Sequence, residues 1–584
     1  MDWEGPAKTA ATLKNAPLDE LSENERIKVS SRGLLLVDDG KQPPHSFRDE
    51  LDQLTRGERE TLSNTAKELS KFFGIYRQRE RGVRGRKSGD HIFMVRIKNP
   101  AGGELSPRQW LALDDAADAF GDATLRITSR QAIQYHHVRG PAPAALVRHL
   151  NLLYRDQGTL GTCGDVNRNV VCSPIDGLDP EHDPRGQELA HAIAEELAPR
   201  SSAYFQSFLS DDQDRQLVPI NEQEPIYSES YLPRKFKLAL GHPSDNSVDA
   251  LTNDVAFVAV AAGGRADGSL WDLWSGGGLG FTHNNPRTAP LLALHLGRIR
   301  RRQVVDAARS IAILQKEHGE RKDRRLSRWK YTIRRLGLEN VRRELRTRFG
   351  IELEDAPPQP LGPMRLHLGW HPQRDGRFWY GVHVPNGRMG AALRRAVRRA
   401  VEELDLGVRL TPNQDLLLCN ATDQRALEAI LRAEDLRPPE SLSLVRRNAS
   451  ACPALPTCGL AMTQAEGILP SYLEAIESAG LGDVDVVIRM TGCPSNCARS
   501  STAEIGIYGY GKNEHVILAG GTRNGTRLGR ILYPRVPAEK MIPVLLGLLR
   551  AIRDRNPGGL PAGEFLHRTD PAQLRAWVGL EEDA

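Results

Sequence analysis

Four cysteines crowd the last quarter of the chain. Cys452 and Cys458 form a C-x5-C pair, and Cys493 and Cys497 form a C-x3-C pair, so four of the seven cysteines fall within 46 residues. A zinc site usually takes pairs two to four residues apart, because a tight turn must present both sulfurs to one small ion. An iron-sulfur cube accepts wider spacing, and prolines such as those after Cys452 and Cys493 turn the chain away from a metal. The spacing favours a cluster, with zinc or buried structural thiols as the alternatives.

Cations in apolar settings form a second set of candidate site residues. In "FMVRIKNP", Arg96 and Lys98 alternate with apolar neighbours, so they share one face of a strand. Arg168 lies in "DVNRNVVCSP", and Lys235 and Lys237 lie in "YLPRKFKLAL". A single such residue is usually a solvated charge at an edge. Several converging in a partly dry pocket would hold a small multivalent anion, because each unit-charge pair at 4 Å contributes roughly 4 kcal/mol at an effective dielectric near 20. Lysines there could also donate protons.

The elements that must position these residues include a repeated strand-helix-strand-helix unit. Its first copy is "HIFMVRIKNP", the helix "SPRQWLALDDAADAFG" with Ser106 as N-cap, "ATLRITSRQAIQYHHV" and the helix "PAALVRHLNLLY". Its second copy is "RFWYGVHVPNG", "ALRRAVRRAVEELD", "LGVRLTPNQDLLLCNA" and "DQRALEAILRA". The stretch from Arg126 to Gln131 aligns with the stretch from Arg409 to Gln414. We predict two copies, at about 88–155 and 362–435, joined in a pseudo-twofold core, with chance similarity of two α/β segments as the alternative.

Composition along the chain suggests five divisions. These are an N-terminal wrapping segment (1–85), a first repeat (86–155), an α+β lobe (156–360), a second repeat (361–435) and an α+β lobe with the clustered cysteines (436–584).

Overall charge and apolar content exclude some classes of protein. Lys+Arg 79 against Asp+Glu 74 gives a net charge of only +5, so bulk charge does not argue for a nucleic-acid or membrane partner. The N-terminus lacks a basic region followed by an apolar core, and the most apolar stretches are too short to span a bilayer. We expect a cytoplasmic protein with reduced thiols, because seven cysteines are too sparse for a disulfide scaffold.

Together with "TSRQAIQYH", "DVNRNV", "LPRKFK" and "GGTRNGTR", the cysteine spacing resembles the sulfite and nitrite reductase hemoprotein family, from about residue 65 to 570. The resemblance implies an α+β fold in which two ferredoxin-like repeats are flanked by two larger α+β lobes that enclose siroheme and a 4Fe-4S cluster. It implies that the cluster is held by Cys452, Cys458, Cys493 and Cys497, and that Cys497 bridges to the siroheme iron.

The resemblance also assigns roles to the cations. It implies a substrate cage made of Arg96, Arg168, Lys235 and Lys237. It implies that the siroheme carboxylates meet Arg126, Arg130, Gln134, His136, Arg321 and Arg324. In some ferredoxin-dependent relatives a tyrosine and a cysteine are linked beside siroheme, and Tyr76 and Cys163 align with those positions, so we predict that they are adjacent.

The implied activity is six-electron reduction of a small anion, and we favour an assimilatory sulfite reductase. Nitrite reduction to ammonia is the alternative, but "TSRQAIQYH" lacks the tryptophan typical of nitrite reductases, and "RKFK" suits a dianion. No G-x-G-x-x-G opens a helix after a strand, so electrons must come from another protein. We favour ferredoxin, in which case the chain would be a monomer, over an NADPH flavoprotein.

A competing hypothesis from another class is a zinc-stapled basic protein that binds nucleic acid through arginine-rich helices at 298–348. It is weakened because no aromatic residues are regularly interleaved with the basic runs.

Overall fold

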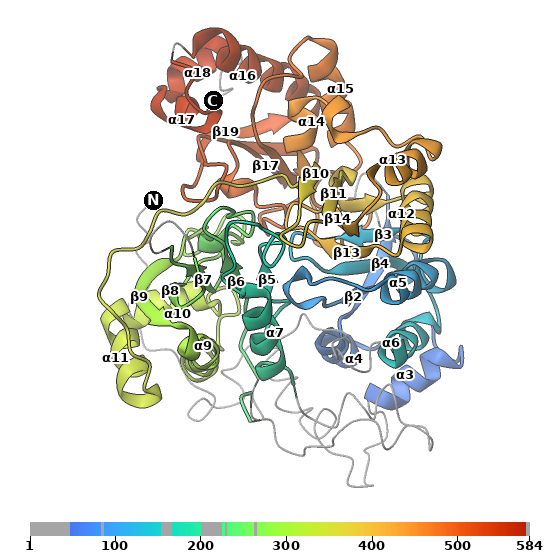
Figure 1. The fold of residues 1–584 in the computed structure, drawn as a ribbon, viewed down its shortest axis with the longest axis vertical. Coiled ribbons are helices and arrows are strands. Elements are labelled where there is room, and N and C mark those ends of the chain that lie inside the picture. Colours follow the sequence, from blue (N-terminus) through green and yellow to red (C-terminus); the bar gives the residue numbers. More distant parts are fainter. Residues whose placement is uncertain are drawn as a thin grey trace.

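The computed structural model describes residues 47–82, 87–153, 166–199, 225–227, 231–261, 266–556 and 558–579. Over these residues the fold is α+β, with four sheets of five, four, five and five strands and helices packed around them. Figure 1 shows the repeats, in blue and gold, stacked on one side of the molecule, with a green lobe beside them and a red lobe above. No helix in these stretches is both long enough and apolar enough to cross a membrane.

The first repeat forms an antiparallel sheet in the order β1-β2-β4-β3-β12. Its strands are β1 (Ile75–Arg81), β2 (Lys87–Ile97), β3 (Leu125–Ile127) and β4 (Ile133–Val138), and the second repeat adds β12 (Arg388–Met389) beside β3. Its helices are α5 (Pro107–Phe120) and α6 (Ala142–Leu153), preceded in the chain by α3 (Phe47–Thr55) and α4 (Asn64–Ser70). Ser106 caps α5 as predicted, because its hydroxyl accepts the Gln109 N–H at 3.3 Å while the Gln109 side chain accepts the Ser106 N–H at 2.9 Å.

The second repeat forms a separate antiparallel sheet in the order β10-β11-β14-β13. Its strands are β10 (Gly369–Pro372), β11 (Phe378–Val382), β13 (Gly407–Leu410) and β14 (Leu416–Ala421), and its helices are α12 (Ala391–Leu404) and α13 (Gln424–Ala433). The order of strands and helices along the chain matches the first repeat, and α12 packs against α5.

Two glutamines at matching positions interlock the repeats. The Gln131 amide donates to the carbonyl of Leu410 in β13 at 2.9 Å, and the Gln414 amide donates to the carbonyl of Ile127 in β3 at 3.4 Å. Both residues have positive φ, 51° and 74°, so each turn takes the same unusual backbone conformation. The reciprocal bonds are what a pseudo-twofold relation requires, and chance similarity between the two segments does not explain them.

Each of the two lobes contains one five-stranded sheet, and the two sheets have the same topology. In the green lobe the order is β5 (Val171–Cys172), β6 (Leu238–Gly241), β7 (Val255–Ala259), β8 (Leu270–Ser275) and β9 (Leu294–Arg300). In the red lobe it is β15 (Ser450–Ala451), β16 (Ile488–Thr491), β17 (Ile505–Gly511), β18 (Glu514–Ala519) and β19 (Arg530–Pro537). In each sheet the first three strands are parallel and the last two antiparallel. The duplication therefore extends beyond the two repeats found in the sequence.

Helices cover both lobe sheets. In the green lobe they are α7 (Gly186–Glu196), α9 (Val304–His318), α10 (Trp329–Leu336) and α11 (Leu338–Phe349). In the red lobe they are α14 (Leu444–Asn448), α15 (Leu469–Ser478), α16 (Met541–Arg555), α17 (Ala562–Arg568) and α18 (Pro571–Val578).

Both lobes have a short 3-10 turn just before the third strand of the sheet. Asp249 precedes the turn in the green lobe and Arg499 precedes it in the red lobe, with φ of 48° and 61°. The hydroxyls of Thr252 and Thr502 donate back to the carbonyls of Asp249 and Arg499, at 2.8 and 3.1 Å. Asp249 and Arg499 thus occupy equivalent places in the two lobes.

Candidate active site

The four clustered cysteines converge at one edge of the red-lobe sheet. Cys452 follows β15 and Cys493 follows β16, and these neighbouring strands are parallel, so their C-terminal ends meet. The Gly492 N–H donates to the Cys452 sulfur at 3.4 Å. Burial, together with the negative charges of the thiolates of Cys497, Cys493 and Cys458, raises the pKa of the Cys452 thiol. All four thiols are therefore close enough to repel one another when ionised.

The spacing of these thiols suits a polynuclear cluster. In the part of the chain that the structure describes, no three His, Cys, Asp or Glu side chains close around a point as the ligands of a single metal ion do. A zinc ion needs four sulfurs at about 2.3 Å, whereas the irons at four corners of an iron-sulfur cube each bind one cysteine sulfur. The sequence spacing of the cysteines remains the argument for a cluster over zinc.

Backbone amides in the cysteine loops stabilise the thiolates. The Cys458 sulfur accepts from the N–H groups of Leu460 and Ala461, which oppose the effect of burial, so that burial raises its pKa only to about 11. The Cys493 sulfur accepts from both the hydroxyl and the N–H of Ser495. Such donors around ligand sulfurs tune the charge of a bound cluster. Cys497 is the most exposed of the four, so its sulfur remains accessible to a second group.

The predicted cage cations gather beside the cysteines. Burial, followed by repulsion from Arg168, lowers the pKa of Arg96 to about 9, while the thiolates of Cys497 and Cys458 act in the opposite direction. Burial lowers the pKa of Lys235 well below its usual range, and repulsion from Arg168 adds to this effect. The sequence could not show that the cations and the cysteines form one site, but the structure does.

Lys237 faces the same group of cations. Burial is the main cause that lowers its pKa to about 7, and the charges of Arg130, Arg328 and Arg168 add to it. Among the described residues, neither Lys237 nor Lys235 has a carboxylate within ion-pair distance of its ammonium. A group of buried cations that outnumbers the nearby carboxylate of Asp254 fits an anionic ligand.

Two further cations join this group. Lys98 is buried, and its ammonium donates to the Asn167 side chain at 3.2 Å. Burial and then Arg168 lower its pKa to about 7. Strand alternation with Arg96 was the signal for Lys98 in the sequence. Arg328, by contrast, had no sequence signal, and it forms a buried ion pair with Asp254 at 2.8 Å.

The residues expected to meet siroheme carboxylates have protein partners in the structure. Arg130 donates to the Asn253 side chain at 2.7 Å and to the carbonyl of Leu238 at 2.8 Å. Arg126 forms an ion pair with Glu466 and donates to the carbonyl of Ala451 at 2.9 Å. Both arginines therefore link segments of the chain that surround the site. Their contacts with a cofactor stay a prediction.

Gln134 and His136 lie closer to the cage. With its amide oriented to satisfy its neighbours, Gln134 accepts from Arg96 Nε at 2.7 Å and donates to His136 Nε2 at 3.2 Å. His136 Nδ1 is buried and has no hydrogen-bond partner among the described residues. An orphaned polar atom beside the cage fits a polar ligand there.

Arg321 and Arg324 lie in the loop between α9 and α10. Arg321 donates to the carbonyls of Tyr231 and Lys316, at 2.7 and 2.9 Å. Arg324 lies near Lys71, and its charge is among the smaller causes that lower the pKa of that lysine, burial being the largest. Their role toward a cofactor stays a prediction.

The Tyr76–Cys163 pair stays a prediction, because Cys163 lies outside the described residues. The Tyr76 hydroxyl is buried and has no hydrogen-bond partner in the described part of the chain. Its ring centroid is 5.5 Å from Arg96 Cζ, so Tyr76 borders the cage.

Comparison with protein families finds two matching models. The nitrite/sulfite reductase ferredoxin-like half domain matches residues 84–152 and 371–434, which are the two repeats. The nitrite and sulphite reductase 4Fe-4S domain matches residues 163–353, which contain Arg168, Lys235 and Lys237, whereas the four clustered cysteines lie beyond that match.

Curated relatives match over nearly the whole chain. The sulfite reductase [NADPH] hemoprotein beta-component of Chromohalobacter salexigens is 35% identical over 578 residues, covering 96% of this chain and 97% of that protein. The protein of the same name from Acidithiobacillus ferrooxidans is 36% identical over 566 residues, covering 94% and 96%. Among solved structures, Mycobacterium tuberculosis NirA superposes with a TM-score of 0.74 at 23% identity, covering 95% of this chain and 98% of that one, so the two share a fold.

Proposed function

We propose that this chain, which belongs to the sulfite and nitrite reductase hemoprotein family, reduces sulfite to sulfide with six electrons. The observation that carries the proposal is the union of four convergent thiols with a group of buried cations in one site. The thiols suit an electron-carrying cluster, and the cations suit an oxyanion substrate.

The cofactors of the family, siroheme and a 4Fe-4S cluster, fit the residues present. Cys452, Cys458, Cys493 and Cys497 would hold the cluster, and the accessible sulfur of Cys497 would bridge to siroheme. When bound, the two groups supply electrons and an iron that binds the substrate. The surplus of buried cations and the unpaired His136 Nδ1 suit a cofactor that carries carboxylates.

The protein's own contribution is to bind the anion, withdraw charge from its oxygens and supply protons. Arg96, whose pKa of about 9 keeps it charged near neutral pH, would hold the oxygens together with Arg168. Lys237, with a pKa lowered to about 7, can give up a proton at physiological pH and regain one from water, so it is suited to protonate a departing oxygen. Lys98, which directly follows β2 and has a similar pKa, would assist.

We infer sulfite as the preferred substrate. The relatives are named sulfite reductases, and two lysines beside two arginines give enough charge for a dianion. The test is anaerobic turnover of the purified protein with an artificial one-electron reductant. We expect kcat/KM to be higher for sulfite than for nitrite, and a strong preference for nitrite would overturn the assignment.

The electron donor is a separate question. The preference for ferredoxin gains no support from the relatives, whose names contain NADPH. We therefore propose an NADPH-dependent flavoprotein as the partner, consistent with the lack of a dinucleotide fingerprint in this chain. The purified chain alone should not oxidise NADPH, whereas addition of a sulfite reductase flavoprotein should start NADPH-driven sulfide formation. Turnover with reduced ferredoxin but not with the flavoprotein would reverse the choice. We propose a cytoplasmic location as part of the same assignment.

The cofactors themselves are checked by an optical and EPR spectrum with iron and zinc analysis. We expect siroheme absorption and a cluster signal with little zinc. A colourless zinc protein would instead support the nucleic-acid hypothesis.

A further inference from the structure

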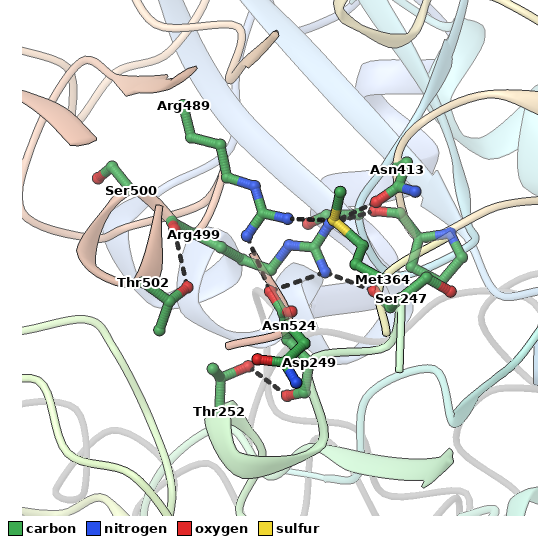
Figure 2. A network of polar contacts seen from close by, with 12 residues as sticks. Ser247, Asp249, Thr252, Met364, Asn413, Arg489, Arg499, Ser500, Thr502 and Asn524 are labelled. Carbon is green, nitrogen blue, oxygen red and sulfur yellow. Dashed lines mark hydrogen bonds and ion pairs between the residues drawn. The ribbon is translucent and has the colours of Figure 1, made fainter. Parts of the chain in front are cut away.

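Asp249 forms a buried junction between the two lobes. Its carboxylate is fully buried, and one oxygen, Oδ2, accepts a hydrogen bond from Arg489 at 2.9 Å and forms an ion pair with Arg499 at 2.9 Å (Figure 2). Asp249 belongs to the green lobe, which carries Lys235 and Lys237, whereas both arginines belong to the red lobe, which carries the cysteines. The contact therefore joins the two halves of the site.

The two arginines flank the cysteine loop. Arg489 lies in β16, four residues before Cys493, and Arg499 lies two residues after Cys497. A single carboxylate thus holds both ends of the segment that contributes Cys493 and Cys497.

Arg499 extends the junction to a third part of the molecule. It donates to the carbonyl of Ser247 at 2.7 Å in the green lobe and to the carbonyl of Pro412 at 2.9 Å in the second repeat. Arg489 reaches the Met364 sulfur at 3.1 Å, in the segment that leads into β10. Figure 2 shows these side chains meeting at one point between the lobes.

The surroundings leave the carboxylate little freedom. Asp249 Oδ1 has no hydrogen-bond partner in the described chain, and Gly525 packs over it, since a Cβ there would lie 2.8 Å from that oxygen. Asp249 itself takes a positive φ of 48°, which costs energy for a residue with a side chain. A strained, buried carboxylate with one shared oxygen is a specific arrangement and not a general surface ion pair.

We propose that Asp249 is a positioning residue for the cluster, which fixes the Cys493–Cys497 loop through Arg489 and Arg499 and balances one of their two charges. The inference rests on the proposed function only in taking these cysteines as cluster ligands. Reduction adds negative charge to a cluster, and uncompensated cations nearby favour the reduced form. Loss of the Asp249 charge should therefore raise the midpoint potential of the cluster.

The experiment is an EPR-monitored redox titration of the purified holoprotein without sulfite, together with its iron content and Tm. Asp249→Asn keeps the side-chain shape and removes the charge, so we expect a more positive midpoint potential. Arg489→Gln should shift the potential in the negative direction. The double variant Asp249→Asn/Arg489→Gln restores the net charge of the triad, so its potential should return towards that of the wild type even if its Tm falls further.

Asp114 offers a matched control. It is a buried carboxylate that accepts from Arg394 at 2.6 Å and from Arg398 at 3.2 Å, in the first repeat and away from the cysteine lobe. Asp114→Asn should lower Tm without moving the potential.

The outcomes separate this inference from the proposed function. Unchanged potentials in both single variants, or a double variant that shifts as far as Asp249→Asn, would overturn the positioning role. If Asp249→Asn cannot hold the cluster, Arg489→Gln and the double variant still show in which direction these charges shift the midpoint potential. Because no substrate is present, a wild type that fails to reduce sulfite would refute the proposed function and leave this result standing.

Discussion

At the scale of single residues, a variant of Lys237 can distinguish a role in binding the substrate anion from a role in binding the cofactors. Its ammonium faces other cations, and its backbone N–H is held by Asp254 at 2.9 Å, so the strand position does not depend on the side-chain charge. We expect Lys237→Met to keep both cofactors and to lower kcat/KM for sulfite by about 10- to 100-fold, because one charged contact to the oxyanion is lost. Steady-state kinetics with an artificial reductant, alongside iron content and the optical spectrum, measures both.

The matched control for this variant is Lys512→Met, because Lys512 is exposed in the turn between β17 and β18. It should behave as the wild type. Equal kinetics in the two variants would remove Lys237 from the substrate site.

The lowered lysine pKa values also predict a pH dependence. Burial lowers the pKa of Lys98 and of Lys237 to about 7, so in the anion-free protein both lose their charge as pH rises through that value. A bound anion stabilises the protonated forms and raises both pKa values, so anion affinity must fall as pH rises from about 6 to about 8. Nitrite stays ionised over this range, so its KM should rise with pH in the wild type and rise less in Lys237→Met. A KM independent of pH would show that these lysines do not titrate there.

At the scale of elements, the loop that contains "GGGLGF" supports the cysteine loop. The Lys330 ammonium donates to the carbonyls of Gly278 and Gly280, both at 2.9 Å, and the Phe281 N–H donates to the carbonyl of Pro494 at 3.1 Å. This glycine-rich stretch, which lacks the spacing of a dinucleotide-binding motif, is therefore a close backbone contact against Cys493–Cys497.

This contact predicts the effect of adding a side chain at Gly280. A Cβ at Gly280 would lie 3.0 Å from the Ser495 carbonyl oxygen, so Gly280→Val must displace the cysteine loop. We expect a loss of stability of about 1–3 kcal/mol and a lower iron content per chain. Thermal unfolding and iron analysis measure the two effects.

The control for the loop is Gly390→Val, because a Cβ at Gly390 meets nothing within 4 Å. That variant should retain the wild-type iron content. If Gly280→Val retained it as well, the loop would not position the cysteines.

At the scale of the whole molecule, the core of the site carries more positive than negative charge. Burial, together with the charge of Arg168, lowers the pKa of Arg96, Lys98, Lys235 and Lys237, and Asp254 is the carboxylate that faces Arg328 and Lys237. Such repulsion destabilises the protein unless an anion balances it. The cofactors and the substrate therefore contribute to folding stability as well as to chemistry.

We accordingly expect protein prepared without siroheme to unfold at a lower temperature than the holoprotein. Sulfate should raise its Tm by a few degrees more than sodium chloride of equal ionic strength does, because a bound dianion stabilises the native state by mass action. The extra increase in Tm with sulfate should be smaller in Lys237→Met and unchanged in Lys512→Met. This comparison distinguishes sulfate binding at the site from a nonspecific effect of salt on stability. Equal effects of sulfate in the two variants would contradict an anion site at Lys237.

Local patterns in the sequence predicted much of the architecture. Strand alternation and helix periodicity gave β2, α5, β4 and their counterparts in the second repeat, and the family models and the structure confirm the ferredoxin-like repeats. The wider duplication of the lobes was missed, because the equivalent turns carry Asp249 in one lobe and Arg499 in the other. Opposite charges at equivalent places hide a repeat from sequence comparison, although the backbone conformation is the same.

The types and spacing of Cys452, Cys458, Cys493 and Cys497 by themselves determined that these thiols could hold a cluster, because ligand chemistry depends on residue type and short-range geometry. Only the tertiary structure decided that Arg96 and Lys235 lie near them, that Arg126 is paired with Glu466, and that Asp249 joins the lobes. These contacts link residues hundreds of positions apart, and their energies depend on burial and distance, which no local pattern specifies.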